Sequence, residues 1–280
     1  MKVLVTGFNG QLGFDVVKEL KSRNIECIGI TREDFSLTDT EKMQAFVREY
    51  KPDVVVHCAA YTAVDKAEDE QDLCDEVNHL ATENLAKVCK ELDAKMIYIS
   101  TDYVFSGSGE SFYEVDDKKA PQNVYGKSKL NGELAVQAIL EKYFIVRISW
   151  VFGSNGKNFI KTMLNLAKTH DKLTVVNDQI GSPTYTVDLA KLLCDMSVSD
   201  KYGVYHATNE GICSWYDFAC EIFKQANIDI TVEPVPSSAF PTKAKRPLNS
   251  RLSKNSLDQA GFSRLPSWQD ALCRYLNNIL

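Results

Sequence analysis

The first 150 residues alternate short apolar runs with amphipathic stretches of helical length, and this alternation constrains the fold more than any other feature. The apolar runs are rich in Val and Ile and lack polar alternation, as strands buried on both faces do. Strands are predicted at Lys2–Thr6, Glu26–Ile30, Asp53–His57, Lys95–Ser100 and Phe144–Ile148, and helices at Gln11–Ser22, Thr40–Tyr50, Leu73–Leu92 and Ser128–Glu141. Strand and helix repeated in this way predict an α/β fold with a doubly wound parallel sheet.

A glycine-rich loop joins the first predicted strand to the first predicted helix, with the spacing Gly-x-x-Gly-x-x-Gly. Gly7 can make the tight turn, Gly10 lets the backbone approach a pyrophosphate, and Gly13 lets the helix pack close to the strand. The free N–H groups and the dipole at the start of the helix favour an anion there. The loop therefore predicts a dinucleotide site. The residues expected to contact the dinucleotide here are Gly7, Asn9, Gly10, Gln11, Leu12 and Gly13.

After about residue 150 the regular alternation fades. Helices are predicted at Asn158–Lys168, Val187–Asp195, Ser214–Ala226 and Pro266–Asn277, and strands at Leu173–Val176, Val204–His206 and Thr231–Pro234. Pro and Ser cluster between residues 234 and 253, which indicates an ordered loop. We expect residues 1–150 to form the dinucleotide-binding domain, with a later contribution from about residues 180–205, and residues 151–280 to form mainly a smaller substrate-binding lobe. A cleft between them would hold the ligands.

Charge and composition argue against several classes of partner. Lys and Arg number 32 against 38 Asp and Glu, a net charge of −6, whereas binding to nucleic acid needs a basic surface. No apolar run reaches the length of a membrane span, so no span is expected. Because a first strand is predicted from residue 2, no signal peptide is expected either. The eight Cys lack Cys-x-x-Cys pairs and zinc-ligand spacing to His, so neither disulfides nor a metal is predicted. Such cysteines suit a reducing cytoplasm.

The end of the second predicted strand bears on the choice of dinucleotide. Sites that prefer NAD usually place an acidic residue there, on the ribose hydroxyls. Here the strand runs into Thr31 and Arg32. Because a guanidinium is a natural partner of a 2′-phosphate, NADPH is the expected cofactor, with NADH possible. The alternative is that Arg32 is an ordinary solvated surface residue.

Three side chains suggest acid–base chemistry. Tyr125 and Lys129 have the spacing Tyr-x-x-x-Lys, which places both on one face if the stretch opens a helix. A nearby ammonium favours tyrosinate and lowers the pKa of the phenol, so the pair can transfer a proton. Thr101 follows the fourth strand, at the carboxyl edge of the sheet. Its hydroxyl can hydrogen-bond the carbonyl oxygen that Tyr125 would protonate.

The glycine loop, the hydroxyl after the fourth strand and the Tyr-x-x-x-Lys pair occur in the order typical of the extended short-chain dehydrogenase/reductases, and the chain resembles that group. More narrowly, it resembles the family of dTDP-4-dehydrorhamnose reductases over essentially its whole length. The blocks that carry this resemblance are Ala59–Glu68, Ser100–Phe105, Val124–Lys129, Arg147–Val151, Asn177–Thr184 and Arg246–Leu252. The resemblance implies a Rossmann-like fold and NADPH-dependent reduction of the C4 ketone of dTDP-4-dehydro-β-L-rhamnose to dTDP-L-rhamnose, a precursor of cell-surface polysaccharide.

The same resemblance implies roles for individual residues. Tyr125 would protonate the C4 oxygen of the sugar, Thr101 would hold that oxygen, and Lys129 would also bind the nicotinamide ribose. The further residues implied for the cofactor are Asp34 and Phe35 at the adenine end, with Ala59, Ala60 and Tyr61 after the third strand. The residues implied for the substrate are Asp102, Tyr103 and Trp150 at the sugar, with Arg246 and Asn249 at the dTDP site.

Other readings of these residues remain open at this point. Trp150 could be a core residue, Asp102 could cap a turn, and Arg246 could pair with surface acids. A related sugar-nucleotide dehydratase or epimerase is an alternative function. Dehydratases resemble Thr-Asp-Glu after the fourth strand, where this chain has Tyr103. A non-catalytic NADP-binding regulatory subunit is another alternative, although the intact Tyr–Lys pair favours an enzyme. The chain is expected to act as a monomer or homodimer on a small molecule.

Overall fold

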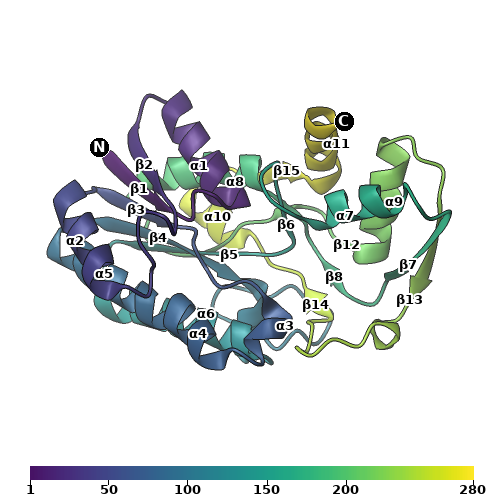
Figure 1. Ribbon diagram of the computed structural model, residues 1–280, viewed down its shortest axis with the longest axis horizontal. Helices are drawn as coiled ribbons and strands as arrows, with labels where there is room; N and C mark the ends of the chain where they lie inside the picture. Colours follow the sequence, from purple (N-terminus) through teal and green to yellow (C-terminus); the bar gives the residue numbers. More distant parts are fainter.

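A six-stranded parallel sheet forms the larger part of the fold in the computed structural model, which describes residues 1–280 (Figure 1). Its strands are β1 (Lys2–Thr6), β2 (Glu26–Ile30), β3 (Val54–His57), β4 (Lys95–Thr101), β5 (Tyr143–Ile148) and β10 (Gly203–His206). The strand order is β10-β5-β4-β3-β1-β2, and every pair is parallel. The chain adds β2 on one side of β1 and β3 on the other, so the predicted doubly wound sheet is confirmed.

Helices cover both faces of this sheet (Figure 1). One layer contains α1 (Gln11–Ser22) and α8 (Thr186–Ser197), and the other contains α2 (Thr40–Tyr50), α5 (Ala81–Glu91) and α6 (Val124–Ile139). Successive strand residues point to opposite faces, so Val3 and Val5 join the core under α1 and α8, whereas Leu4 joins the core under α2 and α5. Both layers need continuous apolar strands, which explains the absence of polar alternation in the sequence.

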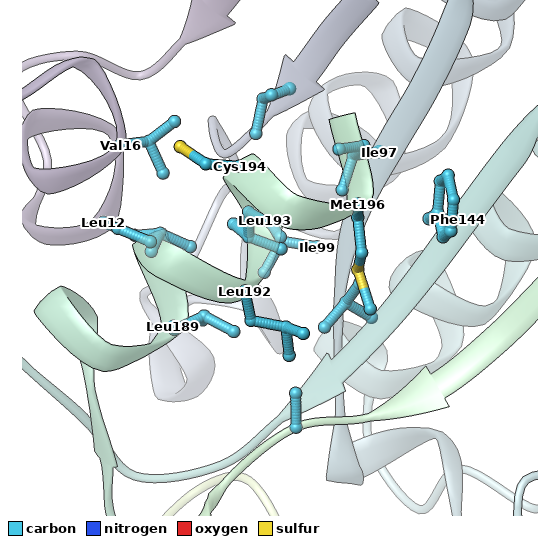
Figure 2. Close-up of a cluster of buried hydrophobic side chains, with 14 of the residues drawn as sticks. Leu12, Val16, Ile97, Ile99, Phe144, Leu189, Leu192, Leu193, Cys194 and Met196 are labelled. Atoms are coloured by element: carbon cyan, nitrogen blue, oxygen red, sulfur yellow. The ribbon is translucent and has the colours of Figure 1, made fainter. Parts of the chain in front are cut away.

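Helix α8 belongs to this core although it comes from the second half of the chain. Figure 2 shows Leu189 and Leu193 of α8 among Leu12 and Val16 of α1 and Ile99 of β4. These side chains are almost completely buried. Burying a side chain of this size is worth roughly 1.5–3 kcal/mol. Helix α8 is therefore a structural part of the sheet domain.

The smaller lobe has its own apolar core. It contains α7 (Phe159–Leu166), α9 (Trp215–Gln225) and α11 (Trp268–Ile279), together with the parallel pair β7 (Lys172–Val176) and β13 (Thr231–Val235). Short elements connect the two parts: β6 (Val151–Phe152), β8 (Ile180–Gly181), β9 (Thr184–Tyr185), β11 (Asn209–Glu210), β12 (Cys213–Ser214), β14 (Asn249–Ser250), α10 (Asn255–Ala260) and β15 (Leu265–Ser267). None of these was predicted, because runs of two to six residues carry too little periodicity.

Two predicted helices differ from the structure near the cavity described below. The stretch predicted as one helix over Leu73–Leu92 consists of α4 (Gln71–Asp75), a π-helical turn (Glu76–Leu80) and α5, preceded by the short α3 (Val64–Ala67). Helix α6 begins at Val124, four residues before the predicted start. The cause is Asn123, whose Oδ1 accepts a hydrogen bond from the amide of Gly126 at 2.8 Å and so caps the helix. This cap places Tyr125 in the first turn.

The structure also gives the state of the cysteines and the character of the helices. All eight Cys are free thiols, among which Cys89 and Cys194 are buried and Cys27 and Cys58 are half-buried. No group of three or more His, Cys, Asp or Glu side chains is placed to hold a metal ion. None of the helices combines the length and the apolar character that crossing a membrane would require.

Candidate active site

The carboxyl ends of five parallel strands open onto one cavity between the sheet and the smaller lobe. Its volume is about 1480 Å³, well above the roughly 300–1,000 Å³ of a typical small-molecule pocket. The lining includes residues that directly follow β1, β2, β3, β4 and β5. Strand β1 is the point where the strand order reverses, and this is where open α/β sheets bind ligands.

The glycine loop closes one end of this cavity, and its geometry fits a pyrophosphate. Gly7 has φ of +72°, which a residue with a side chain rarely adopts. A Cβ on Gly13 would lie 2.3 Å from the carbonyl oxygen of Gly7, so only glycine allows the helix to approach so closely. All six residues predicted here line the cavity: Gly7, Asn9, Gly10, Gln11, Leu12 and Gly13. The cradle therefore leaves backbone N–H groups free to face an anion.

Gln11 has a structural use beside its place in the lining. Its Oε1 accepts hydrogen bonds from the amide of Gly153 at 2.9 Å and from Nδ2 of Asn158 at 3.0 Å. The Gln11 side chain thus ties the glycine loop to the smaller lobe. Leu12, although it reaches the cavity, is mainly a core residue.

The residues predicted for the adenine end divide into two groups. Arg32 and Phe35 line the cavity, as do Ala59, Ala60 and Tyr61 after β3. Asp34 does not. Its carboxylate accepts hydrogen bonds from the amide of Thr31 at 2.7 Å and from its hydroxyl at 3.2 Å, so it closes the turn that carries Arg32. In this structure Asp34 shapes the site without forming its wall.

The three predicted catalytic side chains meet in the cavity. Thr101 ends β4, Tyr125 lies in the first turn of α6, and Lys129 lies one turn later. Burial raises the pKa of the Tyr125 phenol, against the opposing effect of a hydrogen bond with Thr101. Burial also lowers the pKa of Lys129 to about 7, although the carboxylate of Glu133 opposes this. Burial therefore outweighs the expected lowering of the Tyr125 pKa by Lys129.

The ammonium of Lys129 rests on an aromatic ring. Its Nζ lies 4.0 Å from the centroid of the Tyr98 ring, close enough for a cation–π interaction. The Tyr98 hydroxyl donates a hydrogen bond to the carbonyl oxygen of Lys129 or of Asn78, each at 3.3 Å. Tyr98 on β4 therefore holds the Lys129 side chain in place from the side of the sheet.

Glu133 is a residue near the site that the sequence analysis missed. It is fully buried and accepts hydrogen bonds from Nε and Nη2 of Arg147 at 2.9 and 2.7 Å and from the Ser100 hydroxyl at 2.5 Å. These bonds fasten α6 to β4 and β5 directly behind Thr101. The signal available in the sequence was its position four residues after Lys129, on the same helix face.

Asn78 is a second missed residue, and it lies in the π-helical turn. Its side chain is buried and bonds both the amide and the carbonyl of Tyr61, at 2.8 and 3.0 Å. Its Nδ2 also donates to the Ser128 hydroxyl at 3.0 Å. The turn thus joins the loop after β3 to the helix that carries Tyr125. π-helical turns are often found at functional sites.

Asp102 is a buried carboxyl in the cavity wall. It accepts hydrogen bonds from the hydroxyls of Thr101 at 3.0 Å and Ser250 at 2.5 Å. Burial raises its pKa to about 6, although these two bonds oppose the shift. The short turn that follows is capped by Thr101, whose hydroxyl accepts from the amide of Tyr103, so Asp102 is not the capping residue.

The other predicted substrate residues that line the cavity, Tyr103, Arg246 and Trp150, make different contacts. Tyr103 stands edge-on to Tyr125, with ring centroids 5.5 Å apart, and its hydroxyl accepts a hydrogen bond from Arg246 at 3.0 Å. Arg246 also pairs with Asp65 at 2.5 Å, so it lines the cavity and pairs with an acid at once. Trp150 lines the cavity as well.

Asn249, which the resemblance assigns to a block that binds or shapes the dTDP site, does not line the cavity. Its Nδ2 donates to the carbonyl oxygen of Ser111 at 2.8 Å, and its Oδ1 accepts from Arg251 at 2.9 Å. Asn249 is nearly fully buried. Its side chain therefore fixes the loop around residue 110 to β14.

Asp102 should give the stability of the protein a measurable pH dependence. Its pKa is about 6 in the folded protein against 3.8 for an ordinary aspartate, so the unfolded chain ionises first as the pH rises. Below both pKa values the two states are equally protonated, and above about pH 6 the buried carboxylate destabilises the fold. We expect Asp102→Asn to remove a loss of about 2 kcal/mol between about pH 4.5 and pH 7.5.

Urea unfolding at those two pH values checks this expectation. The change between the two values is compared, not the absolute stability, because Asn cannot accept both hydroxyl hydrogen bonds. Asp116→Asn, at an exposed position, is the control. If the free energy of unfolding changes equally with pH in the wild type and in Asp102→Asn, ionisation of Asp102 does not destabilise the fold.

Known proteins resemble this chain over its whole length. A family model described as the RmlD substrate binding domain matches residues 1–280. The spore coat polysaccharide biosynthesis protein SpsK of Bacillus subtilis is 40% identical, over 98% of this chain and 96% of its own length. The crystal structure of a dTDP-4-dehydrorhamnose reductase from Clostridium acetobutylicum superimposes with a TM-score of 0.97 at 44% identity, covering 100% of this chain and 99% of its own.

A second solved structure contains a cofactor. The dTDP-4-dehydrorhamnose reductase of Bacillus anthracis, in complex with NADP, superimposes with a TM-score of 0.96 at 41% identity and covers 99% of both chains. The chain belongs to the family of dTDP-4-dehydrorhamnose reductases, within the extended short-chain dehydrogenase/reductases.

Proposed function

We propose that this protein uses NADPH to reduce the C4 ketone of dTDP-4-dehydro-β-L-rhamnose to dTDP-L-rhamnose. The observation that carries the proposal is that Thr101, Tyr125 and Lys129 line one cavity together with the glycine loop, in a chain of this family. The dehydratase alternative lacks support, because Tyr103 stands where a dehydratase needs an acid and its hydroxyl accepts from Arg246. The relative in spore coat polysaccharide biosynthesis agrees with a role in supplying polysaccharide precursors.

The residues of this chain divide the proposed reaction between them. The glycine loop and the residues after β3 would hold NADPH, which would supply the hydride. The Tyr125 phenol donates the proton to the C4 oxygen, and its high pKa keeps it protonated until charge develops on that oxygen. The Thr101 hydroxyl orients the same oxygen. Lys129 binds the cofactor ribose and offers positive charge beside the phenol.

The direct test is a reduction assay with purified protein. NADPH and the dTDP-bound 4-keto sugar are mixed with the protein, the loss of NADPH absorbance is followed, and the sugar product is identified. Formation of dTDP-L-rhamnose supports the proposal. A folded protein that binds NADPH and leaves the keto sugar unchanged would refute it, and the substrate would then be sought among other nucleotide-linked keto sugars.

Arg32 should set the preference for NADPH. It is exposed at the cavity wall after β2, in the turn that Asp34 closes. Hydrogen bonds to a charged group contribute about 1.5–3 kcal/mol, so Arg32→Ser should lower kcat/KM for NADPH about tenfold or more while NADH changes little. Arg48→Ser, which removes an exposed arginine outside the cavity, is the matched control. An unchanged ratio of the two coenzymes in Arg32→Ser would mean that Arg32 is only a surface residue.

Gly13 should be essential for binding the cofactor. A Cβ at this position would meet the Gly7 carbonyl oxygen at 2.3 Å, so Gly13→Ala must displace the loop from the helix. A displacement of about 1 Å is enough to cost up to about a hundredfold in a positioned site, and NADPH affinity should fall at least tenfold. Fluorescence titration of NADPH measures the affinity, and thermal unfolding shows whether the variant is folded. A folded Gly13→Ala with wild-type affinity would exclude a pyrophosphate at this loop.

We also propose that the two parts of the chain bind different ligands. Residues 1–150 with about 180–205 would bind the cofactor, which the pairing of β10 with β5 and the packing of α8 support. Residues 151–280 would mainly bind the sugar nucleotide. The protein would work in the cytoplasm, where eight free thiols are stable. It would act as a monomer or homodimer. Light scattering on the purified protein measures its oligomeric state; a tetramer or larger assembly would contradict this part.

A further inference from the structure

Trp150 has a backbone conformation that a bulky residue seldom adopts. Its φ is +50°, in the left-handed region, where the side chain crowds the backbone. Such a residue persists only where its surroundings hold it, and these residues cluster at functional sites. Trp150 lies two residues beyond Ile148, which is opposite Thr101 in the sheet. Its ring therefore lines the cavity at the same edge as the proton-transfer residues.

Hydrogen bonds fix the backbone on either side of this residue. The Ser149 hydroxyl donates to the carbonyl oxygen of Ser182 at 2.8 Å, and the Thr184 hydroxyl donates to that of Ser149 at 2.6 Å. The amide of Thr184 donates to the carbonyl oxygen of Trp150 at 3.1 Å. These bonds hold the chain direction, but they leave the indole ring free to turn about its side-chain bonds.

The ring itself is held by two residues of the smaller lobe. Trp215 stacks on Trp150 with ring centroids 3.8 Å apart and an angle of 15° between the planes. Gly181 lies against the same ring, because a Cβ at that position would be 3.0 Å from Cε2 and 3.1 Å from Cζ2 of Trp150. Gly181 pairs with Cys213 in the β8–β12 ladder, two residues before Trp215. One small sheet therefore supplies both contacts.

Trp215 is well anchored for this purpose. It is the first residue of α9, where Ser214 and Asp217 form a reciprocal capping box. Phe159 packs beside its ring at a centroid distance of 4.7 Å. Both Trp150 and Trp215 line the cavity, so the stacked pair forms a wall of the ligand site and is not part of the closed core.

We propose that Trp215 is a positioning residue for the substrate: with Gly181, it holds the indole of Trp150 in the orientation that receives the keto sugar. This inference rests on the proposed function, since it assigns a task within the same cavity. Trp215 would act through Trp150 and leave the cofactor end and the proton donor untouched. Pre-positioning the ring lowers the ordering cost that substrate binding would otherwise bear.

The test combines a spectroscopic signal with steady-state kinetics. Two indoles stacked this closely couple their electronic transitions, which gives a circular dichroism signal that a single indole lacks. We expect Trp215→Leu to remove that signal and to raise KM for the keto sugar about tenfold, with KM for NADPH within about twofold of the wild type. Trp215→Phe, which keeps an aromatic face, should return KM for the keto sugar most of the way to the wild-type value. Trp268→Phe, which alters the third tryptophan outside the cavity, should keep both the signal and KM.

The outcomes separate this inference from the proposed function. If the wild type reduces the keto sugar and Trp215→Leu loses the coupled signal without a change in KM, the positioning role is refuted and the function stands. If Trp215→Leu does not fold, Gly181→Ala takes its place, because its Cβ would push the same ring. A rise in KM for the sugar in Gly181→Ala then supports the role, and an unchanged KM refutes it. A wild type that does not reduce the keto sugar refutes both.

Discussion

Tyr125→Phe is expected to lower kcat by about 10²–10⁴-fold and to leave the affinity for NADPH within about twofold of the wild type. Only the phenolic oxygen is removed, so the ring still stands edge-on to Tyr103. The variant lacks the group that would donate a proton to the C4 oxygen in the transition state. Tyr125 is half-buried and lines the cavity, so the bound keto sugar and cofactor would keep bulk water from replacing that proton.

The experiment compares three proteins at several pH values. The wild type and Tyr125→Phe are assayed for keto-sugar reduction, and NADPH binding is measured separately by fluorescence. Tyr202→Phe is the matched control, because its hydroxyl bonds Asp200 on the surface and neither residue lines the cavity. Near-normal turnover in Tyr125→Phe would show that another group supplies the proton. Asp102, whose pKa is about 6, would then be the first to examine, through Asp102→Asn.

Glu133→Ala is expected to lower the free energy of unfolding by about 3–5 kcal/mol, because it leaves Arg147 as a buried, unpaired charge. Both side chains are only 2% exposed, and Arg147 makes two of the hydrogen bonds to Glu133. The Ser100 hydroxyl would also lose its acceptor. This cost is much larger than that of a surface ion pair, for which about 0–1 kcal/mol is usual.

Chemical denaturation measures the difference. Glu91→Ala is the control, since Glu91 pairs with Arg48 on the surface. Replacing both members of the buried pair, as in Glu133→Leu with Arg147→Met, should recover most of the stability, since well-packed apolar residues can substitute for a buried pair. A loss below about 1 kcal/mol in Glu133→Ala would mean that water or a neighbouring group solvates Arg147 in the variant.

These two predictions concern the same helix. Tyr125, Lys129 and Glu133 follow one another at intervals of four residues along α6, so they share one face. The first two side chains reach the cavity, whereas the third is fastened behind Thr101 to the sheet. The buried ion pair thus fixes the helix that presents the proton donor. Loss of the pair should therefore affect turnover as well as stability.

The local pattern of the chain was enough to predict the sheet and the cofactor loop. The strands were recognisable because both of their faces are buried, which requires unbroken apolar runs whatever the neighbours are. The positions of Gly7 and Gly13 were also predictable, because a positive φ and a close helix–loop approach exclude other residues. Thr101, Tyr125 and Lys129 could be grouped because strand ends share one sheet edge and helix spacing sets a common face.

The rest depended on contacts between segments far apart in the chain, which carry no local signal. Asn78 bonds Tyr61 from a π-helical turn. Trp215 stacks on Trp150 next to the paired strands β8 and β12. Asn249 lies in a block that resembles a substrate site, yet its amide is used by the loop around residue 110. Burial likewise raises the pKa of Asp102 to about 6 and lowers that of Lys129 to about 7, and desolvation depends on what the tertiary structure packs around a group.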